Sequence, residues 1–174
     1  MDIPTIRVFT AERMPLLSPD RIRAGIEDRL ALLTYLFCPD KEENPVAVIA
    51  RLRVEAGPGN EVRIRWRPRM RFPIRVYRFG PELPDQLASV AADYDEQRQY
   101  LAAATDGAGL FQGYERNDMG WPTALAVAAV LAEARGGIIA TSTSGWFRVQ
   151  GRNLLPVPHA AGHTSHPAAG RLRR

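Results

Sequence analysis

Apolar and basic side chains alternate between residues 62 and 76, and this pattern constrains the fold more than any other in the chain. The apolar residues occupy even positions: Val62, Ile64, Trp66, Met70, Phe72, Ile74 and Val76. Arginines occupy odd positions: Arg63, Arg65, Arg67, Arg69, Arg71 and Arg75. A period of two predicts β-strands with one buried and one solvated face. Because Pro68 and Pro73 cannot donate to a strand ladder, we expect two strands, or an edge strand with a break, and a bend near Pro68.

Other segments predict further strands around this run. Residues 3–9 predict a short opening strand. Residues 46–54 predict a strand that leads into the turn-forming sequence at 56–60, and therefore a hairpin with the alternating segment. Residues 138–140 and 146–149, on either side of a Ser-Thr-Ser-Gly turn, predict a terminal strand pair.

Three segments predict helices. The first begins at Ser18-Pro19-Asp20, where a capping oxygen, a proline and an acid stand in the order typical of a helix start. Apolar residues then recur at steps of three and four as far as Phe37. A second helix is expected from Pro84 to about Ala104, and an alanine-rich third over residues 124–135, which Gly136-Gly137 stops. The order of elements predicts an α+β fold, a largely antiparallel sheet with about three helices packed on one face.

The length of 174 residues suits one compact domain. We expect this α+β domain to cover residues 1–155. Residues 156–174 are rich in proline, alanine, glycine and histidine and end in Arg171, Arg173 and Arg174, which predicts a flexible basic tail.

Hydropathy predicts a cytoplasmic protein with no membrane partner. The longest apolar stretch, 123–134, is shorter than the roughly 20 residues that span a bilayer. The first residues, Met1-Asp2-Ile3-Pro4, lack the features of a secretory signal. Cys38 is the only cysteine, so it cannot form an internal disulfide, and we interpret it as a buried thiol.

Charge is distributed unevenly along the chain. The net charge of +4 conceals a basic segment, 61–80, with seven basic residues and one acid, and an acidic segment, 81–134, with two basic residues and nine acids. The six alternating arginines named above could neutralise the phosphates of a nucleic acid or another polyanion. They could equally form an ordinary solvated strand face. The alternation places Trp66 and Phe72 on the opposite, buried face, which argues against stacking of single-stranded bases.

The acidic segment is a candidate docking surface for a basic protein partner. Its candidate contact residues are Asp93, Asp95, Glu96, Glu115, Asp118 and Tyr114. Buried aromatic anchors surrounded by charges are typical of such interfaces.

No pattern predicts catalysis, a cofactor or a metal site. Gly107, Gly109 and Gly113 nearly form a dinucleotide-binding loop, but they follow an expected helix rather than a strand, so we interpret them as an ordinary connection. The three histidines, His159, His163 and His166, all lie in the expected tail, where ordered ligands are not expected. We therefore expect a non-catalytic protein.

One segment carries a resemblance to a known family. Residues 124–147 comprise a packed helix, Gly-Gly, a short strand, a turn and Gly-Trp-Phe. This succession resembles the end of bacterial toxin-neutralising immunity proteins of the polymorphic-toxin type. The resemblance implies a small cytoplasmic protein that binds and occludes a cognate toxin. The alternative hypothesis is a nucleic-acid or polyanion-binding accessory protein that uses the arginine-rich strand face. The sequence leaves the partner's identity and the oligomeric state open.

Overall fold

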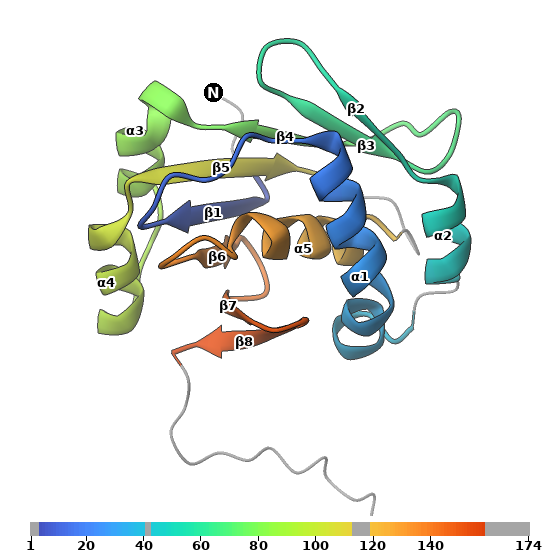
Figure 1. Cartoon of the computed structure of the whole chain (residues 1–174). Coiled ribbons are helices and arrows are strands. Elements are labelled where there is room, and N and C mark those ends of the chain that lie inside the picture. Colours follow the sequence, from blue (N-terminus) through green and yellow to red (C-terminus); the bar gives the residue numbers. More distant parts are fainter. Residues whose placement is uncertain (1–3, 41–42, 113–118, 159–174) are drawn as a thin grey trace, which may run out of the picture.

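A computed structural model describes residues 4–40, 43–112 and 119–158. Its eight strands form one open antiparallel sheet in the order β2-β3-β4-β5-β1-β6-β7-β8 (Figure 1). The strands are β1 Ile6–Thr10, β2 Arg53–Ala56, β3 Val62–Arg65, β4 Ile74–Arg78, β5 Asp106–Phe111, β6 Ile138–Thr141, β7 Trp146–Gln150 and β8 Asn153–Val157. The predicted α+β class and antiparallel sheet are confirmed.

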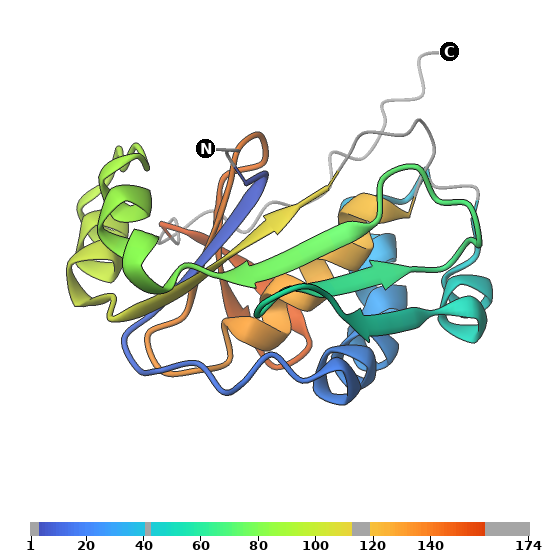
Figure 2. The ribbon, with the colours of Figure 1, turned by 90° about the horizontal axis from the view of Figure 1, so that it is seen from above.

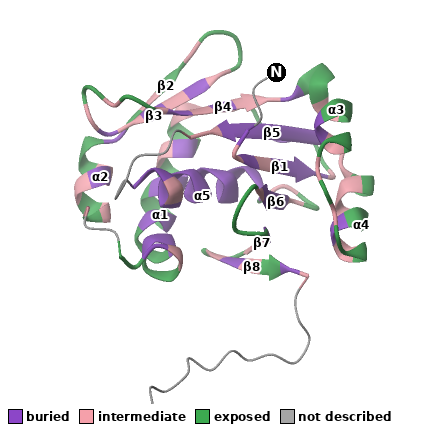
Figure 3. Ribbon diagram, turned by 180° about the vertical axis from the view of Figure 1, so that it is seen from behind, coloured by how far each residue is buried: buried purple, intermediate pink, exposed green. Residues whose placement is uncertain are grey.

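The described residues contain five α-helices rather than about three. They are α1 Pro19–Phe37, α2 Pro45–Arg51, α3 Leu83–Ala88, α4 Asp95–Ala103 and α5 Gly120–Leu131, and a short 3-10 turn at Gly80–Glu82 precedes α3. Helix α5 is buried almost all round because it lies between the sheet and α1, as its uniformly apolar sequence requires (Figure 3).

The helices cover both faces of the sheet, so the prediction that they pack on one face is wrong. On β1, Ile6 and Val8 point into the large core shared with α1 and α5. Phe9 points the other way, into a second cluster that receives Leu83 and Leu87 from α3 and side chains from α4. This second cluster also includes Trp146 of β7, Val157 of β8 and Tyr77 of β4, but no described residue of β2 or β3. Seen from above, β2, β3 and β4 lie in front, with α5 and α1 on their far side (Figure 2).

The start of α1 is confirmed, although its expected cap is not. Pro19 is the first helical residue, and the amide of Ile22 donates to the Ser18 carbonyl at 3.0 Å. The Ser18 side chain makes no capping hydrogen bond. The amphipathic stripe therefore accounts for the helix better than the cap does.

The segment expected as a strand at 46–54 is divided between a helix and a strand. The Asn44 side chain accepts a hydrogen bond from the Val46 amide at 2.9 Å, and Pro45 occupies the first helical position. These two signals start α2 in spite of its β-branched residues. Only the last residues form β2, and β2 pairs with β3 in the expected hairpin.

The single helix expected from Pro84 to Ala104 is broken into α3 and α4. Arg7 of β1 donates to the Gln86 side chain at 3.0 Å and to the Ser89 hydroxyl at 3.3 Å, which fixes the end of α3 against the sheet. The Gln97 side chain accepts from the Asp93 amide at 3.0 Å before α4 begins.

The glycine-containing connection expected at residues 107–113 is instead a central strand. β5 pairs with β4 and β1. A Cβ at Gly109 would lie 2.9 Å from the Tyr77 and Phe79 rings, and a Cβ at Gly107 would lie 2.7 Å from Phe79. The two glycines therefore make room for aromatic rings on one face of the strand.

Helix α5 begins four residues before the expected start and ends at Leu131, so the prediction that Gly136-Gly137 stops a helix running to Arg135 is wrong. Gly136 has a φ of 68°, a left-handed conformation that favours glycine. At the C-terminal end, β8 runs to Val157, which is buried, so the chain stays in the sheet slightly beyond residue 155. Residues 159–174 of the expected tail lie outside the described residues.

Candidate functional site

Arginines face one another on the outer side of the β2-β3-β4 part of the sheet. The strand register places Arg53 opposite Arg65, and Arg63 opposite Arg75. Like charges in directly opposite positions destabilise a sheet. This group, Arg53, Arg63, Arg65 and Arg75, is called the arginine face below. Its repulsion must be offset by nearby acids, by water or by an anionic ligand.

Glutamates offset part of this charge. Glu61 lies 2.5 Å from Arg63 and 4.0 Å from Arg75, and Glu55 lies 2.9 Å from Arg65. The three arginine side chains keep about 40% of their surface exposed. Exposed pairs of this kind contribute at most about 1 kcal/mol each. Between residues 43 and 75 there are eight arginines and three glutamates, so the surface remains strongly positive.

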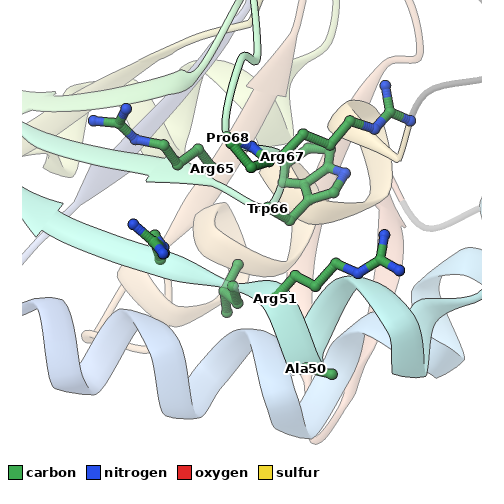
Figure 4. A pocket seen from close by; sticks show the side chains of 8 residues that line it. Ala50, Arg51, Arg65, Trp66, Arg67 and Pro68 are labelled. Carbon is green, nitrogen blue, oxygen red and sulfur yellow. The ribbon is translucent and has the colours of Figure 1, made fainter.

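A pocket of about 460 Å³ opens where β2 and β3 diverge (Figure 4). Its lining includes four arginines from α2, β2, β3 and the connection that follows β3: Arg51, Arg53, Arg65 and Arg67. Arg51 and Arg67 extend to one side of the Trp66 ring and Arg65 to the other (Figure 4). The arginines therefore flank a cleft rather than converge on one point, which suits an extended anion better than a single small ion.

Glu43 pairs with one of the arginines that line this pocket. Its Oε2 accepts from Arg67 at 2.9 Å and from the Trp66 indole at 3.4 Å. Within the described part of the chain, Arg51 and Arg53 form no ion pair. Neither residue was predicted from the sequence as part of a site. The period-two pattern stops before them, and Arg51 entered the site only because α2 replaced an expected strand.

The six predicted arginines do not form one continuous ladder. Arg63, Arg65 and Arg75 lie on strands, whereas Arg69 and Arg71 are exposed in the connection between β3 and β4. Trp66 is buried, as expected. Met70 is only partly buried and Phe72 is 36% exposed, so the prediction that Phe72 belongs to the buried face is wrong. The chain leaves the sheet after Arg65. Between there and Ile74, where β4 begins, the alternation in the sequence does not correspond to a buried and an exposed strand face.

A second hollow, of about 310 Å³, lies beside this connection. Its lining comes from the connection before β4, from β4 itself, and from the end of β5 and the residue after it: Arg71, Phe72, Pro73, Arg75, Phe111 and Gln112. The Arg71 guanidinium lies 5.0 Å from the centre of the Phe72 ring, and that of Arg75 lies 4.9 Å from the centre of Phe111. Phe111 also stacks on Tyr77, with the ring planes 9° apart. This side of the sheet therefore carries aromatic rings that the sequence analysis did not place there.

Arg7 lies on β1, where α3 packs against the sheet. Burial lowers the pKa of its guanidinium from the ordinary value, and the nearby Tyr77 partly offsets that shift. Its hydrogen bonds to Gln86 and Ser89 show that it fastens α3 to β1. We therefore interpret Arg7 as structural.

The predicted acidic docking residues are described only in part. Asp93, Asp95 and the less exposed Glu96 lie at the start of α4, at the opposite end of the molecule from α2 (Figure 1). Asp95 pairs with Arg98 at 2.6 Å. Tyr94, between the two aspartates, is 55% exposed. Tyr114, Glu115 and Asp118 lie outside the described residues.

The described residues show neither a metal-binding cluster nor a membrane-spanning helix. Among residues 4–40, 43–112 and 119–158, no three His, Cys, Asp or Glu side chains gather in a metal-binding arrangement. The three histidines are not in those ranges. None of the described helices is both long and apolar enough to span a membrane.

The chain was also compared with models of protein families, with curated proteins and with solved structures, and none of them matched.

Proposed function

We propose that this chain is a non-catalytic nucleic-acid-binding protein whose binding surface is the arginine face. The observation that carries the proposal is the placement of Arg53 opposite Arg65 and Arg63 opposite Arg75 on a part of the sheet that no described helix covers. Folding alone does not favour such pairs, because directly opposed like charges raise the free energy of the folded state. A row of phosphates removes that cost and releases counterions.

The shape of the surface favours an extended anion. The arginines continue from the strands into the cleft that Arg51 and Arg67 flank (Figure 4). Guanidinium groups bind phosphate oxygens through paired hydrogen bonds, which arginine provides better than lysine. Backbone contacts of this kind give affinity and position rather than sequence specificity.

The proposal predicts a salt-dependent loss of affinity when the face is neutralised. The variant Arg53→Gln/Arg63→Gln/Arg65→Gln should bind a fluorescent oligonucleotide at least about tenfold more weakly at low salt. Because each lost phosphate contact lowers the slope of log K against log salt by about 0.7 to 0.9, the slope should fall by about two. Fluorescence anisotropy at salt concentrations between about 50 and 200 mM measures both quantities.

A matched control removes the same charge elsewhere. Arg98, Arg135 and Arg152 each belong to an exposed ion pair outside the arginine face. Their triple glutamine variant should retain most of the affinity and the salt slope. Conversely, Glu55→Gln should tighten binding, since it releases Arg65. Equal losses in the two triple variants, or no binding by the unaltered chain, would contradict the proposal.

A second candidate function is a protein-binding module of the immunity type, which would occlude a cognate toxin. The observation in its favour is the exposed ring of Tyr94 between Asp93 and Asp95, because an aromatic ring among charges is a common interface anchor. This surface lies far from the arginine face, so the two candidates can be tested separately.

The second candidate predicts that Asp93→Lys/Asp95→Lys/Glu96→Lys abolishes retention of one protein partner from nuclease-treated native lysate at high salt. The matched control reverses three exposed acids elsewhere: Glu12, Glu27 and Asp40. Mass spectrometry of the retained proteins is the measurement. If both variants keep the same partner, or the unaltered chain retains none, this candidate is excluded.

A further inference from the structure

We propose that the hollow lined by Phe72 and Phe111 receives an unstacked base, so that the nucleic acid bound by the arginine face is single-stranded. This inference rests on the proposed function and specifies its ligand. The hollow adjoins the arginine face directly, since Arg75 belongs to both. A strand whose phosphates lie along β2 and β3 can therefore place a base there.

The aromatic geometry beside the hollow is that of a stacking site. Tyr77 and Phe111 stack with their centres 5.1 Å apart, and the half-exposed Arg75 guanidinium lies against Phe111. Planar guanidinium groups and aromatic rings are the usual platforms for unpaired bases. A base that stacks on Arg75 or on Phe72 would extend a series of planar groups that already exists.

Phe72 is a second feature that favours a ligand-binding site here. It is one of the few large apolar side chains left exposed among the described residues, and it lies at the rim of a hollow. Proline at position 73 stiffens the connection that carries it. An exposed ring held beside a concave surface is a feature of ligand-binding sites rather than of the core.

A duplex cannot make this contact, because its bases are paired and stacked inside the helix. The inference therefore separates two kinds of ligand that the arginine face alone would bind alike. It also separates an ordinary single strand from an abasic strand, which has the same phosphates and no bases.

The test measures affinity for single-stranded, abasic and duplex oligonucleotides, with DNA and RNA versions of the single strand. The unaltered chain should bind the single strand about tenfold to a hundredfold more tightly than the abasic strand. Phe72→Ala should remove that difference and leave the salt slope unchanged. Phe72→Trp should keep it, and so should Tyr35→Ala, which removes an aromatic ring 75% exposed on α1.

The outcomes distinguish this inference from the function on which it rests. If single, abasic and duplex strands bind alike and Phe72→Ala changes nothing, the base site is refuted, while the phosphate-binding face stands. If no oligonucleotide binds, both are refuted. Thermal unfolding of each variant verifies that a loss of binding is not a loss of folding.

Discussion

Replacing Asp106 with asparagine should destabilise the protein by about 3 to 5 kcal/mol, the usual cost of removing one partner from a buried ion pair. Asp106 lies on β5 and pairs with Arg78 of β4, and the two side chains are only 11% and 15% exposed. Its carboxylate also accepts hydrogen bonds from the amides of Met14 and Gly107, each at 2.8 Å. Asparagine would leave the Arg78 guanidinium without its counter-charge.

Urea unfolding at neutral pH measures this loss. The matched control is Asp95→Asn, which breaks an exposed ion pair on α4 and should change the free energy of unfolding by no more than about 0.5 kcal/mol. The Asp106→Asn/Arg78→Met double variant should lose less than the sum of the single variants, because it leaves no unpaired charge. Similar effects of Asp95→Asn and Asp106→Asn would show that the pair is not a buried one.

The same carboxylate should give the protein a characteristic acid dependence. Burial alone would raise the pKa of Asp106, but hydrogen bonds from Arg78, Met14 and Gly107, with the charge of Arg78, outweigh it and lower the pKa. A carboxylate whose pKa is lower in the folded state stabilises that state above its ordinary pKa of about 3.9 and loses this effect as the pH falls further. The difference in unfolding free energy between the unaltered chain and Asp106→Asn should therefore be constant from about pH 5 to 8 and shrink below about pH 4.

Local patterns were reliable where the chain stays in one regular element. The even positions of the alternating segment are buried on β3 and β4, including Ile64, Ile74 and Val76. The start of α1 followed from Pro19, and its extent from the apolar residues that recur at steps of three and four. Period and turn chemistry act on neighbouring residues, so the sequence contains the information that determines these elements.

The central strand β5 could not be predicted in this way. Its sequence, Asp-Gly-Ala-Gly-Leu-Phe, has weak strand propensity and suggests a loop. Gly107 and Gly109 are needed because aromatic rings from β1, from β4 and from the residue after β4 lie against them: Phe9, Tyr77 and Phe79. These residues are distant in the sequence, and the requirement is visible only when the strands lie side by side.

Only part of the candidate site was predicted from the sequence. Period two identified the outward positions of Arg63, Arg65 and Arg75. Their pairing across strands, and the addition of Arg53, depended on the hairpin register. The aromatic part of the site depended on Phe111 of β5, which was expected in a loop, and on Phe72, which was expected in the core.

Replacing Gly25 with alanine should destabilise the protein by about 1 to 3 kcal/mol, the usual cost of overpacking, although alanine is the better helix former by about 1 kcal/mol. Gly25 lies where α1 crosses α5, and the two helices pack closely along their lengths. A Cβ at this position would lie 1.9 Å from a methyl carbon of Val130, which is itself buried. The helices must separate or Val130 must move, and both weaken the central layer between α1 and the sheet.

A double-mutant cycle with Val130→Ala identifies the cause. Val130→Ala alone removes buried methyl groups and should destabilise the protein, whereas the added methyl of Gly25→Ala would occupy the space that they vacate. The double variant should therefore be more stable than the sum of the two changes by about 1 to 3 kcal/mol. Ala31→Gly, at an exposed position of the same helix, gives the helix propensity term without the contact. If Gly25→Ala stabilises the protein equally in both backgrounds, only propensity operates there, and the close approach of α1 and α5 is not what determines the glycine.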